Sequence, residues 1–218
     1  MACFLIVTVL WIFSVCLHEF GHAIVAYYGG DTTVREKGYL TFNPLKYTHP
    51  VYSLLMPVLF MMMGGIGLPG GAVYIERDRL RSRYWETAVS LAGPAMNLLL
   101  IVFLCLPFRF AWIEMSRGNV VAYSLAFLIQ LEISSVLLCL LPIPPLDGFR
   151  AISPWLPREM VDRLLAQSSS FIWGLFLILW YVPAANHGFW SVVSAAADTL
   201  NIDSRLAYFG WREFQFWR

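Results

Sequence analysis

Charged side chains are scarce in this sequence, and their scarcity excludes an ordinary water-soluble domain. Asp, Glu, Lys and Arg together make up 13% of the 218 residues, whereas apolar residues make up 59%. A typical soluble chain carries about twice that share of charge. A surface in contact with water cannot be built from so few charges, so the composition predicts an integral membrane protein.

Three further absences narrow the class of membrane protein to which the chain can belong. The net charge is only +1, so the chain lacks the basic field that attracts nucleic acid, and we expect no nucleic-acid partner. No CxxC pair is present, and the four cysteines lie in apolar stretches, which is typical of small buried side chains rather than disulfides or zinc knuckles. Four histidines are too few for a di-iron lipid hydroxylase or for ligands repeated along a metal-transport path.

Long apolar runs predict the transmembrane helices. Residues 2–28 are long enough to cross a bilayer core of about 30 Å before Gly29-Gly30 breaks the helix. This run has no basic leading region and no small-residue cleavage site, so we expect it to be a retained helix rather than a signal peptide. Further spans are predicted at 85–107, 119–141 and 168–182, the last with an extension to Trp190 if the helix continues.

The segments between these runs are harder to assign. Residues 52–68 are apolar but rich in Gly, so they form either a short span or a re-entrant segment. Residues 32–42 favour a short β-hairpin and 72–75 a short strand, whereas the charged stretch 76–83 indicates a surface loop. Lys and Arg divide almost equally between the two faces, which leaves the sidedness open.

The expected fold is therefore an all-α polytopic membrane protein with about five (four to six) transmembrane helices and short β-like or re-entrant segments between the first and third helical runs. We expect residues 1–218 to form one domain. Its core would cover residues 4–150, and an additional helix and an interfacial tail would cover residues 151–218.

The sequence His18-Glu19-Phe20-Gly21-His22 matches the metal-binding pattern H-E-x-x-H. Residues four apart on a helix lie one turn apart on the same face, so both imidazoles can bind one metal ion. Glu19 can then act on a metal-bound water without being a ligand. The motif is short, but ionisable groups inside an otherwise uncharged membrane helix are costly and usually functional, which favours a zinc site.

A catalytic zinc ion commonly has three protein ligands, so a third ligand is needed. The remaining histidines, His49 and His187, lie in predicted loops. Glu132 is a second carboxylate within a predicted span. Asp147 is better placed, because the proline-rich break at 142–148 lets its carboxylate turn inward. Zinc with two ionised carboxylates also sums to zero charge, the least costly state in a low dielectric.

Three motifs occur in a fixed order: HEFGH at 18–22, LAGPAMN at 91–97 and LLPIPPLDG at 140–148. With these motifs the chain resembles the site-2 protease family of intramembrane zinc metalloproteases over residues 4–150. The resemblance implies a minimal catalytic core, without the PDZ and nucleotide-sensing modules that some relatives carry.

The resemblance also implies a role for each motif residue. His18, His22 and Asp147 would be the zinc ligands and Glu19 the general base, with one zinc ion per chain. Asn97 would help to bind substrate or the oxyanion.

The roles of Asn97 and Cys139 stay open. A buried amide such as Asn97 also forms helix-packing hydrogen bonds, and Gly93 and Pro94 would allow another backbone to approach closely. Many relatives have asparagine where this chain has Cys139, which leaves one polar contact to substrate or backbone in question.

The expected function is hydrolysis of a peptide bond in or near a transmembrane segment of a membrane protein substrate, within the cytoplasmic membrane of a prokaryote. The β-like segments would hold an extended substrate by strand addition. The alternative is a catalytically silent membrane protein of the same fold that binds partners. The intact ligands and Glu19 argue against that alternative, because a binding module needs no general base.

Overall fold

The computed structural model describes residues 1–43, 46 and 73–217, and all structural statements below concern this part of the chain. It is built from helices, with no β-strand among the described residues. In chain order the elements are α1 (Ala2–Gly29), α2 (Thr33–Glu36), η3 (Arg77–Arg79), α4 (Arg83–Arg109), α5 (Val120–Cys139), α6 (Asp147–Ile152), η4 (Ser153–Trp155), α7 (Arg158–Ala166), α8 (Ser168–Tyr181), α9 (Pro183–Thr199) and α10 (Ser204–Phe214).

Three of these helices are long and apolar enough to cross a membrane. They are α1, α4 and α5, with 28, 27 and 20 residues, and the pair α7 and α8, bent by 61°, adds a fourth candidate. Large apolar side chains point outward from the spans, for example Val9 and Phe103, which are 63% and 62% exposed. Outward apolar faces on helices of this length are typical of contact with lipid, so the chain is an integral all-α membrane protein.

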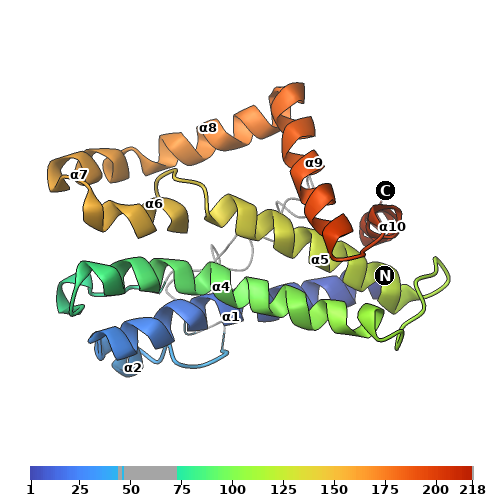
Figure 1. Cartoon of the computed structure of the whole chain (residues 1–218), viewed down its shortest axis with the longest axis horizontal. Coiled ribbons are helices and arrows are strands. Elements are labelled where there is room, and N and C mark those ends of the chain that lie inside the picture. The colour runs from blue at the N-terminus through green and yellow to red at the C-terminus, as the bar shows by residue number, and fades with distance from the viewer. Residues whose placement is uncertain (44–45, 47–72, 218) are drawn as a thin grey trace.

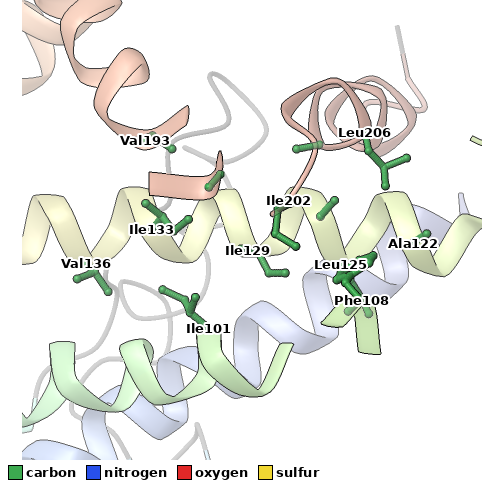
Figure 2. Packing of buried hydrophobic residues seen from close by; sticks show 13 residues of the cluster. Ile101, Phe108, Ala122, Leu125, Ile129, Ile133, Val136, Val193, Ile202 and Leu206 are labelled. Atoms are coloured by element: carbon green, nitrogen blue, oxygen red, sulfur yellow. The ribbon is translucent and has the colours of Figure 1, made fainter. Parts of the chain in front are cut away.

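The spans α1, α4 and α5 lie side by side (Figure 1). The backbone N–H of Arg81 donates to the carbonyl of Gly29 (2.9 Å), so α4 begins where α1 ends and the two helices run antiparallel. The third span, α5, is the most buried of the three. Apolar residues of α4, α9 and α10 surround it in one continuous cluster (Figure 2).

The short helix α6 is fixed against the start of α4. The Thr87 hydroxyl donates to the Ala151 carbonyl (2.7 Å), and the Trp155 indole donates to the Thr87 hydroxyl (3.0 Å). A side chain at Gly148 would overlap the carbonyl of Leu140, so glycine lets the turn between α5 and α6 close tightly. These contacts place the first residue of α6, Asp147, beside α4.

The helices predicted at 2–28, 85–107 and 119–141 are confirmed, with ends that agree within two residues. The span predicted at 168–182 is α8, but its extension to Trp190 as one helix is wrong. The helix ends at Tyr181 and a new one, α9, begins at Pro183, which has no N–H to continue the earlier helix. The prediction for 52–68 lies outside the described residues.

The hairpin predicted at 32–42 is also wrong, because the chain forms α2 followed by turns. The Asp31 carboxylate accepts hydrogen bonds from the backbone N–H (3.0 Å) and hydroxyl (2.6 Å) of Thr33, an arrangement that starts a helical turn. Residues 73–75 of the predicted strand 72–75 have no regular structure. The N–H of Val73 donates to Glu19 (3.1 Å) and not to a neighbouring strand.

Replacing Gly210 by Ala tests how α10 is docked. A Cβ at Gly210 would overlap the Tyr123 carbonyl and lie 2.8 Å from Cβ of Phe127, so α10 must move away from α5. We expect Gly210→Ala to lower the thermal unfolding temperature in detergent by several degrees, as expected for a cost of about 1–3 kcal/mol from overpacking. The matched control is Gly188→Ala in α9, because no atom lies within 4 Å of the added Cβ. This variant should have an equal or slightly higher unfolding temperature. Equal losses in both variants would contradict the docked position of α10.

Candidate metal centre

The structure brings His18, His22 and Asp147 together in the bundle interior. The two Nε2 atoms lie 3.0 Å apart. Oδ2 of Asp147 lies 3.3 Å from Nε2 of His18, and its Oδ1 lies 3.5 Å from Nε2 of His22. Zinc ligands at about 2.0–2.2 Å in a tetrahedron are separated by about 3.3–3.6 Å. Both distances from Asp147 fall in this range and the two Nε2 atoms are slightly closer, so the group has the chemistry and nearly the spacing of a zinc site. The histidines are 4% and 8% exposed.

Each imidazole forms a hydrogen bond with a residue of α4 through Nδ1, the ring nitrogen that faces away from the metal position. Nδ1 of His18 lies 3.2 Å from Oδ1 of Asn97, and Nδ1 of His22 lies 2.6 Å from the carbonyl of Val89. Both partners accept, so each Nδ1 carries the proton and each Nε2 presents its lone pair to the metal position. Such outer hydrogen bonds orient metal-binding histidines and raise their basicity.

Two glycines allow α1 and α4 to approach at this point. A Cβ at Gly93 of α4 would lie 2.5 Å from Nε2 of His18 and would overlap Nε2 of His22. A Cβ at Gly21 of α1 would lie 2.8 Å from the carbonyl of Ala92. The sequence predicted the close approach of another backbone at Gly93, whereas the nearest groups in the structure are the imidazole side chains of His18 and His22.

Glu19 lies beside the ligand group but outside it. Its side chain is 4% exposed, and its Oε2 accepts the hydrogen bond from the Val73 N–H. The ligand group of the described residues contains His18, His22 and Asp147 only. Glu19 is therefore placed as a base would be, close to the metal position without occupying it.

The alternative ligands lie elsewhere. Glu132 is fully buried in α5, and neither of its carboxylate oxygens has a hydrogen-bond partner among the described residues. It is not part of the ligand group. His187 is exposed on α9, and His49 lies outside the described residues.

The carboxylate of Asp147 faces the Nε2 atoms of both histidines, with one oxygen toward each. A metal ion binds such a residue as the ionised carboxylate. The thiol of Cys139 faces the same carboxylate. The residue that replaces the usual asparagine thus contacts a predicted ligand in this structure.

The three predicted ligands lie together, but two of their contacts were not predicted from the sequence. Val89 acts through its backbone carbonyl, which any residue carries, so no sequence signal could reveal it. Asn97 was assigned to substrate, whereas the structure places its side-chain oxygen on His18, which makes it a positioning residue. Its predicted contact with substrate stays a prediction.

A helical membrane protein with a buried His–His–Asp group and an adjoining glutamate has the features of a membrane zinc metalloprotease. Comparison with known proteins agrees. The chain is 43% identical to "Putative zinc metalloprotease Rip2" of Mycolicibacterium smegmatis over 215 residues, which cover 98% of this chain and 81% of the relative. It is 32% identical to "Putative zinc metalloprotease YwhC" of Bacillus subtilis over 206 residues, which cover 90% and 89%.

The chain belongs to the site-2 protease family of zinc metalloproteases. No family model matches it, and no solved structure matches it.

Replacing Gly93 by Ala tests the close approach of α4. The new methyl group would stand against both Nε2 atoms, so we expect Gly93→Ala to lose most of its zinc while the helices stay folded. The matched control is Gly174→Ala in α8, which has no atom within 4 Å of the added methyl and should keep its zinc. Elemental analysis and circular dichroism of both purified variants check this. Full zinc retention in Gly93→Ala would show that the zinc ion does not bind between Gly93 and the two histidines.

A second pair of variants identifies the carboxylate ligand. Asp147→Asn preserves side-chain volume but removes the negative charge, so we expect zinc affinity to fall by at least about 10–100-fold. Glu132→Gln changes the other buried carboxylate in the same way and should leave the affinity unchanged. Competition with a zinc-binding dye measures both. The reverse result would make Glu132 the third ligand.

Proposed function

We propose that this chain is a zinc-dependent intramembrane endopeptidase with one zinc ion per chain, which hydrolyses a peptide bond in or near a transmembrane segment of a membrane protein. The observation that carries the proposal is the position of the ligand group inside a membrane span. At 1.5 Å per residue, His18 lies about 24 Å along α1 from Ala2 and about 16 Å from Gly29, which is well within a bilayer core of about 30 Å.

A bound zinc ion would lower the pKa of a coordinated water to about 7 and polarise the peptide carbonyl. His18, His22 and Asp147 would hold the ion, while Asn97 and the Val89 carbonyl keep the two imidazoles in the required tautomer.

Glu19 would accept the proton of the attacking water on its carboxylate. The same carboxylate would then donate that proton to the amide nitrogen that leaves as an amine. The hydrogen bond from Val73 to Oε2 supports this role, because it fixes the orientation of Glu19 without using its other oxygen.

The substrate must present an unwound segment, because a transmembrane helix keeps its amides in internal hydrogen bonds. The segment that contains Val73 is a candidate contact, since its backbone lies beside Glu19 without belonging to a helix or strand. The curated relatives are bacterial, so we place the activity in the cytoplasmic membrane of a prokaryotic cell.

Glu19→Gln should separate chemistry from metal binding. The substitution removes the proton acceptor and none of the three proposed ligands, so zinc content should stay at the wild-type level. We expect hydrolysis to fall by about two to four powers of ten, because general-base catalysis commonly contributes a factor of this size. His22→Ala is the contrasting variant and should lose both zinc and activity.

The assay should compare two classes of substrate in reconstituted vesicles. A panel of single-span membrane proteins tests intramembrane cleavage, and an unfolded water-soluble protein tests ordinary proteolysis. Mass spectrometry of the products locates the cleaved bond. Cleavage of the soluble protein alone would contradict an intramembrane protease. No cleavage of any substrate by the zinc-loaded wild type would favour the catalytically silent alternative.

A further inference from the structure

The C-terminal helix α10 lies across the ends of the transmembrane spans. The Cys3 thiol donates to the Gly210 carbonyl (3.3 Å), and the rings of Phe4 and Phe214 have centroids 5.1 Å apart. Because Cys3 and Phe4 are at the start of α1, α10 covers the end of that span. Figure 1 shows α10 end-on while α1, α4 and α5 run lengthwise, so its axis crosses theirs, as expected of a helix in the plane of the membrane surface.

Exposed aromatic side chains at this end of the bundle indicate that it lies at the level of the lipid headgroups. Five of them are between 40% and 70% exposed there, in the connection between α4 and α5 and along the C-terminal segment: Phe110, Trp112, Tyr208, Phe216 and Trp217. Exposed aromatic residues at the ends of spans are typical of the boundary between lipid tails and water. We therefore expect this end of the bundle at the level of the lipid headgroups.

A pocket at this end of the bundle is lined by three arginines. It has a volume of about 330 Å³ and is formed by Arg117 from the connection between α4 and α5 together with α10 residues Ser204, Arg205, Tyr208, Phe209 and Arg212. The volume falls within the range of roughly 300–1,000 Å³ that is usual for small-ligand sites. The Arg117 guanidinium lies 5.8 Å from the centre of the Phe209 ring, which holds this charge at the pocket.

None of the three arginines forms an ion pair with a described residue. Two nearby acids have other partners. Asp203 caps α10 by accepting from the Arg205 N–H (2.8 Å), and Asp198 accepts from the Ser204 hydroxyl (3.3 Å). Arg205 also stands in the first turn of α10, where a positive charge opposes the helix dipole. Helix stability therefore does not explain Arg205, whereas Arg212 stands in the last turn of α10, where a positive charge is favourable.

We propose that this pocket binds the phosphate group of an anionic phospholipid. Guanidinium groups suit phosphate because they donate paired hydrogen bonds and keep their charge at all relevant pH values. The hydroxyl of Tyr208 would donate to a remaining headgroup oxygen, while the exposed aromatic residues would lie beside the upper acyl chains. Anionic headgroups at the membrane surface attract basic clusters of this kind.

The test uses the full-length protein in a neutral detergent, with bound ligand measured by native mass spectrometry. Three probes are titrated: phosphatidylglycerol, phosphatidylcholine with the same acyl chains, and inorganic phosphate. We expect phosphatidylglycerol to bind about tenfold or more tightly than the other two. Arg205→Gln and Arg212→Gln should each weaken its binding by about tenfold, as expected when one charge-assisted contact is lost.

Arg109→Gln is the matched control. Arg109 stands in the last turn of α4, at the same end of the bundle, but it does not line the pocket. The Arg109→Gln variant should bind phosphatidylglycerol within about twofold of the wild-type affinity, since the substitution removes only general surface charge. An equal loss in Arg109→Gln, or equal binding of phosphatidylcholine, would overturn the site. Equal binding of inorganic phosphate would make the ligand a free anion instead of a membrane lipid. Unchanged zinc content and circular dichroism would show that the variants are folded.

Discussion

The helices α1 and α4 pack tightly where Gly93 faces the Nε2 atoms of His18 and His22. Only a residue without a side chain fits at this position, so the distance between the two spans fixes the space around the metal position. The same approach brings Val89 and Asn97 within hydrogen-bonding distance of the two imidazoles. A shift of α4 by the width of a methyl group would disturb the ligands and the groups that orient them.

Placing ionisable groups inside a membrane requires that their charges compensate one another. Two histidines face one aspartate in the interior, and Glu19 has a backbone donor. A zinc ion with ionised Asp147 and Glu19 would bring the net charge of the centre to zero. Loss of the ion would leave two carboxylates close together in a low dielectric, which links metal binding to the stability of the centre.

Much of this arrangement could be predicted from the sequence, because a membrane span must satisfy its backbone hydrogen bonds internally and because H-E-x-x-H depends on local helix geometry. The ends of the three long spans and the pairing of His18 with His22 followed from such local patterns, whereas Asp147 was expected from the proline-rich break, the charge balance and the family resemblance. The structure added what depends on tertiary contact: the Val89 carbonyl on His22 and the docking of α10 through Gly210. The hairpin at 32–42 failed because the Asp31 side chain starts a helical turn there.

X-ray absorption at the zinc edge of the purified protein tests the proposed zinc site most directly. The account predicts one zinc ion per chain with two imidazole nitrogens at about 2.0–2.1 Å, carboxylate oxygen at about 2.0–2.2 Å and no sulfur neighbour. Cys139 is the thiol that faces Asp147, so it is the competing ligand. A sulfur neighbour at about 2.3 Å, or a number of imidazoles other than two, would contradict the ligand set proposed here.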